Sequence, residues 1–176
     1  MKRQVTAALL AAGTALAISA ATAMPAAAAT SGPETFSITI VTSGVSGTRT
    51  VISSVIIAKG VFSGVGRIVE LPSQPGDPAN VDRDDLVFPK GTMHLLTTHG
   101  SASFTLNVHN CLFSGTQQQT SEVTGGTGQF AAATGSFTGT ASGQGLLPRN
   151  PDGSCAFGQP SLHEEDLIST SGTLSF

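Results

Sequence analysis

Residues 103–113 read SFTLNVHNCLF, and this stretch decides the fold class. Apolar and polar side chains alternate along it, with Phe104, Leu106 and Val108 separated by Thr105, Asn107 and His109. Successive side chains of a β-strand point to opposite faces, so a period of two is typical of a half-buried strand. The pattern predicts a strand whose three apolar side chains face the interior.

The same alternation occurs at residues 35–40 and recurs along the chain. Phe36, Ile38 and Ile40 are separated by threonine and serine in residues 35–40. Further strands are predicted at residues 51–58, 60–71, 92–98, 113–123, 129–142 and 168–176. The composition agrees, because glycine, serine, threonine and phenylalanine are abundant and only 11% of residues are charged. Residues 161–167 (SLHEEDL) are either one short helix or a charged loop.

About eight antiparallel strands predict a single all-β domain over residues 30–176. A sheet of this size leaves exposed edges unless it closes or stacks. We therefore expect an eight-stranded antiparallel β-barrel, and the alternative is a β-sandwich. Two irregular segments, residues 72–90 and 146–158, connect strands and are expected at a mouth of the barrel.

Residues 1–29 have the features of a secretory signal peptide. Lys2 and Arg3 precede an uncharged, alanine-rich stretch, and small residues offer a cleavage site after Ala29. The alternative, a membrane anchor, needs about 20 strongly apolar residues. We expect a secreted protein that has no membrane span after cleavage. The mature chain then carries six basic and eleven acidic residues, which argues against a nucleic-acid partner.

Cys111 and Cys155 are the only cysteines, and both lie in the exported part. Oxidising surroundings favour a disulfide between them. Its 44-residue separation corresponds to a stabilisation of roughly 3–4 kcal/mol. The alternatives are two free thiols or a metal pair, but two cysteines alone cannot complete a zinc site.

Residues 123–139 read VTGGTGQFAAATGSFTG, in which a glycine-rich turn leads into a strand with small residues. This pattern resembles the plant dirigent proteins and the allene oxide cyclases, which share one eight-stranded barrel. Residues 84–89 (DDLVFP), Gly91, Thr92 and the cysteine pair look like small exported actinobacterial proteins of that barrel group. The resemblance implies a barrel open at one end. In the plant families its cavity binds oxylipin or phenoxyl-type intermediates and guides their cyclisation or coupling.

The sequence does not satisfy the requirements of three familiar types of binding motif: dinucleotide, calcium and histidine–metal. Residues 126–131 match the dinucleotide pattern G-x-G-x-x-A, but that pattern requires a following helix, and here the sequence continues as a strand. The acidic residues between 82 and 85 lack the spacing of a calcium loop. His94 and His99 fall on opposite faces of one strand, and no H-x-H or H-E-x-x-H motif is present. We expect no metal and no cofactor.

Three functions remain open, and the barrel interior separates them. A binder of a small apolar molecule is expected to have an open, uncharged cavity lined by Phe36, Ile38, Ile40, Phe104, Leu106 and Val108. An isomerase- or cyclase-like enzyme would have a buried carboxylate, and Glu70, Asp85 and His94 are the candidate acid–base residues. A structural cell-envelope protein would have a solidly packed core. We expect binding rather than catalysis.

Overall fold

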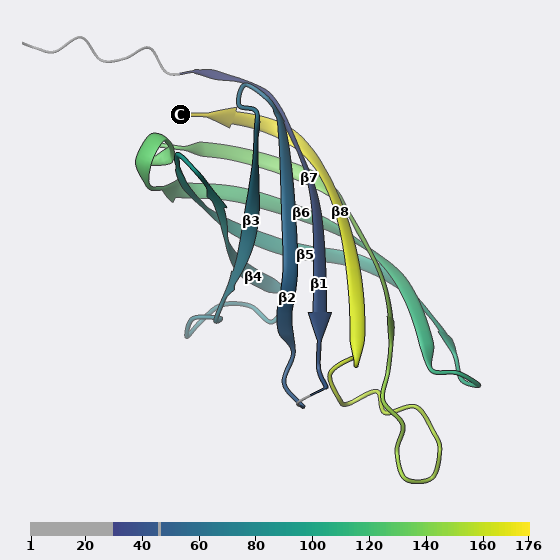
Figure 1. Ribbon diagram of the computed structural model, residues 1–176. Coiled ribbons are helices and arrows are strands. Elements are labelled where there is room, and N and C mark those ends of the chain that lie inside the picture. Colours follow the sequence, from purple (N-terminus) through teal and green to yellow (C-terminus); the bar gives the residue numbers. More distant parts are fainter. Residues whose placement is uncertain (1–29, 46) are drawn as a thin grey trace, which may run out of the picture.

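The chain forms a closed barrel of eight antiparallel strands (Figure 1). The computed structural model describes residues 30–45 and 47–176, so the predicted signal peptide lies outside the described residues. The strands are β1 (Ser31–Ser43), β2 (Thr50–Gly60), β3 (Gly64–Leu71), β4 (Val81–Phe88), β5 (Gly91–Asn107), β6 (Leu112–Gly126), β7 (Thr134–Leu146) and β8 (His163–Ser175). Each strand pairs with the next along the chain, and β8 pairs with β1. The predicted barrel is confirmed.

The number of strands agrees with the prediction, but two strands are assigned differently. Residues 81–88, predicted as part of a loop, form β4. Residues 92–98 and 103–113, predicted as two strands, belong largely to β5, which has a register shift between His99 and Ala102. Before the shift the odd-numbered residues face inward, namely Met93, Leu95 and Thr97. After it the even-numbered residues do, namely Ala102 and Phe104, as their pairing partners on β6 show.

Two further local predictions need correction. Residues 161–167, expected as a helix or a loop, include the first five residues of β8. The glycine-rich turn does not lead directly into a strand. It passes through a 3-10 turn (Gly128–Phe130) before β7 begins at Thr134.

Within the described part of the chain, no helix is long and apolar enough to cross a bilayer.

Phenylalanine side chains fill one end of the barrel. Phe36 and Phe137 pack with their ring centroids 5.0 Å apart, and Phe130 lies 5.8 Å from Phe88 and 5.3 Å from Phe176. Phe36, Phe130 and Phe137 are almost completely buried. Burial of each such ring contributes about 1.5–3 kcal/mol. This end is therefore the closed, packed end, and both ends of the described chain lie beside it (Figure 1).

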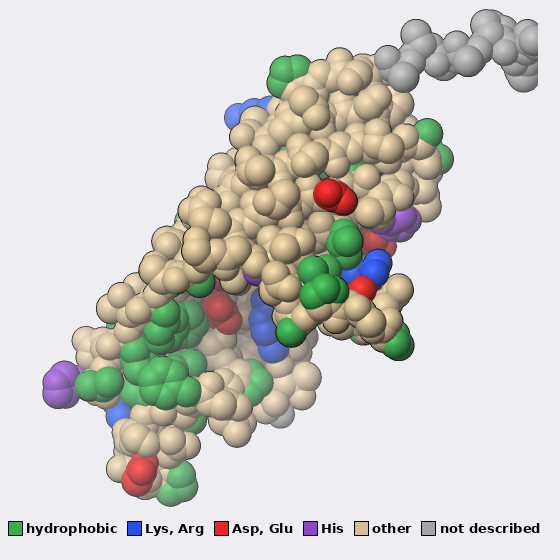
Figure 2. All heavy atoms as spheres, turned by 180° about the vertical axis from the view of Figure 1, so that it is seen from behind, with side chains coloured by type: hydrophobic (Ala, Val, Ile, Leu, Met, Phe, Trp, Pro, Cys, Tyr) green, Lys and Arg blue, Asp and Glu red, His purple; other side chains and the backbone are tan. Residues whose placement is uncertain are grey.

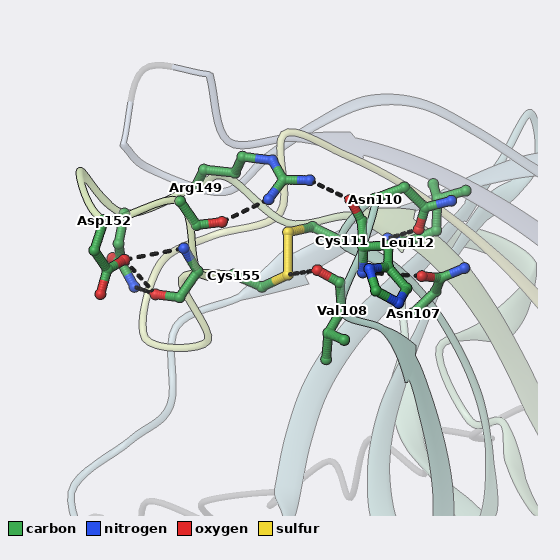
Figure 3. The surroundings of a disulfide bond; sticks show 12 residues. Asn107, Val108, Asn110, Cys111, Leu112, Arg149, Asp152 and Cys155 are labelled. Atoms are coloured by element: carbon green, nitrogen blue, oxygen red, sulfur yellow. Dashed lines mark hydrogen bonds between the residues drawn. A yellow bond between two sulfur atoms is a disulfide. The ribbon is translucent and has the colours of Figure 1, made fainter.

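A disulfide fastens the segment between β7 and β8 to the hairpin of β5 and β6 (Figure 3). Cys111 lies in the hairpin turn and Cys155 in the 147–162 segment, with their Cα atoms 5.5 Å apart. Arg149 adds a link, because its guanidinium donates to the backbone oxygens of His109 and Gly153. The predicted pairing is confirmed, and the segment is held at the end opposite the phenylalanine core (Figure 1).

Candidate functional site

The end of the barrel opposite the phenylalanine core contains a cavity of about 510 Å³. Its apolar floor is continuous with the core, because Phe36, Ile38 and Phe137 belong to both. The remaining apolar lining residues are Ile40, Ile68, Leu71, Leu86, Leu95, Ala141 and Ile168. The barrel is therefore packed at one end and hollow at the other.

Charged side chains line the cavity nearer its mouth. Five carboxylates and two guanidinium groups face it, from Glu70, Asp82, Asp84, Glu164, Asp166, Arg49 and Arg83. The space-filling view shows acidic and basic side chains inside a hollow in the barrel wall (Figure 2). The excess of carboxylates makes the mouth acidic, which favours cations and hydrogen-bond donors as ligands.

Arg49 connects two walls of this mouth. It precedes β2, and its guanidinium donates to Glu70 at the end of β3 at 2.5 Å. It also lies 3.9 Å from the carboxylate of Asp166 on β8. Arg83, by contrast, forms two hydrogen bonds of 2.8 Å with Asp77 in the β3–β4 connection. Arg49 is therefore the cation that lies among the cavity carboxylates, while Arg83 is engaged by a loop residue.

Two carboxyl groups in the cavity have raised pKa values. Burial raises the pKa of Asp84 to about 7, and the nearby negative charges of Asp82 and Glu70 add to the effect. Burial also raises the pKa of Asp166 to about 6, with a further contribution from Glu164 that Arg49 opposes. Near neutral pH, Asp84 therefore exists in both protonation states and Asp166 is mostly ionised. Such a pair can donate and accept protons.

Neutral polar side chains complete the lining. Gln117, Gln119 and Ser121 point inward from β6, and Ser121 forms a 2.9 Å hydroxyl–hydroxyl hydrogen bond with Thr97 of β5. His99 also faces the cavity, and its ring lies 2.7 Å from the carboxylate of Asp82. In the described ranges, no group of three or more histidine, cysteine, aspartate or glutamate residues is arranged to hold a metal ion.

The three predicted acid–base candidates do not come together. Glu70 lines the cavity mouth beside Arg49. Asp85 and His94 form a 2.6 Å hydrogen bond with each other but lie on the outer face, because they alternate with the inward-facing Asp84 and Leu95. The structure therefore pairs Asp85 with His94 outside the cavity and leaves Glu70 as the one of the three candidates that lines it. The sequence predicts a loop for residues 72–90, so alternation was not applied to Asp84 and Asp85, which lie on β4.

The predicted apolar ligand-binding residues also divide into two groups. Phe36, Ile38 and Ile40 line the cavity. Phe104 and Val108 are 57% and 63% exposed, and Leu106 is half-buried, so their expected burial inside the barrel is wrong. The hairpin of β5 and β6 extends past the shorter strands β3 and β4, and Val108 lies in the turn itself (Figure 1). Leu106 packs against the cluster of Cys111, Leu147 and Cys155, whereas Phe104 and Val108 are left largely exposed.

Sequence reasoning missed Arg49, Asp84 and Asp166. For Asp84 and Asp166, the sequence pattern that could have identified them is their spacing from apolar residues on the same strand. Asp84 is two residues before Leu86, and Asp166 is two residues before Ile168, so each polar residue continues the inward face of an apolar neighbour. Comparisons of the chain with protein-family models, with curated proteins and with solved structures gave no match.

Proposed function

We propose that this barrel binds a small organic molecule in its cavity, with an apolar part on the floor and a polar part at the mouth. The cavity carries this proposal. Its volume of about 510 Å³ lies within the range of small-molecule sites, and its lining combines an apolar floor with converging polar groups. The uncharged cavity expected for a binder of an apolar molecule is not what the structure has, because carboxylates and guanidinium groups line the mouth. A purely apolar ligand would leave these charged groups desolvated without partners, so we favour an amphiphilic ligand instead.

The test is native mass spectrometry of protein purified from the culture supernatant. We expect a retained small molecule in the wild-type protein and its loss in Ile168→Trp, because the larger ring fills the cavity. The matched control is Ile57→Trp, since Ile57 is exposed on the outer face of β2. Repeated absence of a ligand, together with no thermal shift from amphiphilic probes, would contradict the proposal.

A second candidate function is acid–base catalysis of an isomerisation or cyclisation. The specific observation in its favour is that two carboxyl groups with pKa values of about 7 and about 6 share one cavity. In such a reaction protonated Asp84 would donate a proton at one position of the substrate, and a carboxylate would remove one at another. No net oxidant or reductant is needed, because the atoms of the substrate are only rearranged.

An isomerase leaves a chemical signature that a binder does not. We expect wild-type protein to retain product and Asp84→Asn to retain unreacted substrate of the same mass but with a different chromatographic retention time. Identical retained molecules in both proteins would indicate binding alone. A cavity of this kind gives no support to the solidly packed interior expected of a purely structural protein.

Export and kinship with the dirigent and allene oxide cyclase barrels are further parts of this proposal. The alanine-rich leader and the disulfide are compatible with secretion. The closed eight-stranded barrel with one hollow end is compatible with the family resemblance of the glycine-rich turn. Detection of the protein in the medium with residues 1–29 removed would support export.

A further inference from the structure

Beyond the cavity mouth, the exposed Phe104 and Phe157 and the half-buried Phe113 form a continuous aromatic surface, here called the aromatic shelf. The rings of Phe104 and Phe113 lie 5.7 Å apart and nearly parallel, and the ring of Phe157 lies 6.4 Å from Phe104. Phe104 and Phe157 are more than half exposed. Exposed aromatic clusters are uncommon on soluble monomers and mark binding surfaces. A green apolar patch borders the charged hollow in Figure 2.

Strand register places this shelf on the same inner face as the cavity carboxylates. One row of paired residues runs from Asp166 on β8 through Gly143 and Gly115 to Phe104 on β5. The next row runs from Glu164 through Gly145 to Phe113. Residues paired directly across a sheet share a face. Carboxylates and phenyl rings therefore stand on opposite sides of a strip of glycines.

Gly143 and Gly115 leave the first row without side chains between Asp166 and Phe104, whereas the ring of Phe113 covers Gly145 in the second row. Three strand spacings separate the Cα atoms of Asp166 and Phe104, which is about 14 Å. Both flanking side chains lie toward the strip: a Cβ atom on Gly143 would be 2.5 Å from Oδ1 of Asp166, and one on Gly115 would be 3.8 Å from the ring of Phe104. Larger residues at Gly143 or Gly115 would fill the space between the acid and the ring.

The chemistry on the two sides selects one class of ligand. A phenyl face attracts cations through its quadrupole, and a carboxylate attracts them through its charge. Arg49 only partly neutralises Asp166, because its guanidinium lies 3.9 Å from that carboxylate and donates its short hydrogen bond to Glu70. An anion would meet Glu164 and Asp166, and a neutral apolar group would use the shelf but not the acids.

We propose that the space over Gly143 and Gly115, between Asp166 and the aromatic shelf, binds an organic cation, such as a protonated amine or a quaternary ammonium group. This inference rests on the proposed ligand-binding function and names the chemical class of the ligand. The cationic group lies between the carboxylate and the Phe104 ring, and the apolar remainder of the ligand extends into the cavity.

The test compares choline with 3,3-dimethylbutan-1-ol, its uncharged counterpart of the same shape, by NMR titration of the full mature protein. We expect choline to bind at least roughly ten-fold more tightly. Phe104→Leu should weaken choline binding by roughly three- to thirty-fold, which is the usual range for a cation–aromatic contact. Asp166→Asn should also weaken it, because the neutral amide removes the attraction between the carboxylate and the ammonium group. Phe104→Leu keeps an apolar side chain and should change the affinity for the neutral alcohol less than about two-fold.

Val108→Ala is the matched control, because Val108 is an exposed apolar residue in the same hairpin outside the shelf. Equal affinity for choline and the alcohol would overturn the organic-cation inference and leave the binding function intact. Failure of both probes to bind, with a retained ligand that carries no cationic group, would overturn it as well. Failure of both probes and no retained ligand would overturn the inference and the proposed function together.

Discussion

At the scale of single residues, the position of one carboxylate relative to its neighbour decides its chemistry. Asp84 and Asp85 are adjacent on β4, yet Asp84 faces the cavity and Asp85 faces outward toward His94. Burial raises the pKa of Asp84 to about 7, and the carboxylates of Asp82 and Glu70 raise it further. Because neighbouring side chains of a strand point to opposite faces, Asp84 can exchange protons in the cavity while Asp85 forms a hydrogen bond on the surface.

The raised pKa of Asp84 predicts a pH dependence of stability. The folded protein binds the Asp84 proton more tightly than the unfolded chain does, so this group favours the folded state most at low pH. Its contribution is lost as the pH rises from about 4 to about 7. Asp84→Asn should therefore raise the Tm at pH 8 and flatten the fall in Tm between pH 5 and pH 8. Thermal melts across this range measure both effects.

Glu122→Gln is the control for that experiment, because Glu122 is exposed on the outer face of β6. It should leave the slope of Tm against pH close to that of the wild-type protein. If Asp84→Asn and wild type have parallel curves, the carboxyl of Asp84 is not desolvated in the folded protein.

At the scale of elements, the hairpin of β5 and β6 depends on a covalent link. It is built from the two longest strands and extends beyond the closed part of the barrel (Figure 1). Its turn holds Cys111 at φ 58°, in the left-handed region that costs non-glycine residues about 1–2 kcal/mol. The disulfide to Cys155, with Leu147 packed against it, holds this turn. The aromatic shelf includes residues from both linked segments.

Removal of the disulfide should destabilise the protein and loosen the shelf. We expect Cys111→Ser combined with Cys155→Ser to lower the Tm by several degrees, because the loss of a link of this span corresponds to roughly 3–4 kcal/mol. Hydrogen exchange should accelerate most in residues 104–113 and 147–162. An unchanged melt, or free thiols in the wild-type protein, would contradict this prediction.

At the scale of the whole molecule, closure of the barrel leaves one end packed and the other open. Twelve residue pairs join β1 to β8 and remove the sheet edges. Thr30 and Phe176 exchange two backbone hydrogen bonds beside the phenylalanine core. The packed end supplies apolar burial, which allows the opposite end to hold desolvated carboxyl groups that lower stability at neutral pH. The division separates the stabilising core from the candidate site.

The position of β1 makes the predicted cleavage after Ala29 testable. The barrel begins with Ser31, and Thr30 already bonds to Phe176, so a cut after Ala29 preserves every strand. We expect the protein from the medium to have the mass of residues 30–176 with one disulfide. A protein expressed directly as residues 30–176 should melt at the same temperature. An uncut mass would contradict the signal peptide.

The sequence by itself determined the strand period, the fold class, the disulfide partners and the apolar floor at Phe36, Ile38 and Ile40. Only the tertiary structure decided which side chains meet at the mouth. Alternation is visible when apolar residues face inward, but the cavity walls are polar. The inward positions of β4 and β8 at the mouth hold charged residues, namely Asp82, Asp84, Glu164 and Asp166. These segments therefore show no apolar alternation, and the sequence predicts a loop for residues 72–90 and a helix or loop for residues 161–167.

The same reason explains the misplaced hairpin residues. The alternation around Phe104 correctly predicted a strand with Phe104 on its inner face. In the structure, the register shift in β5 places Phe104 on the same inner face as Leu95 and Thr97. It carried no information on whether an opposite wall exists, because strand length and barrel closure depend on pairing between distant segments. Local periodicity fixes the face on which a side chain stands, and the three-dimensional arrangement decides whether that face is buried, solvated or part of a site.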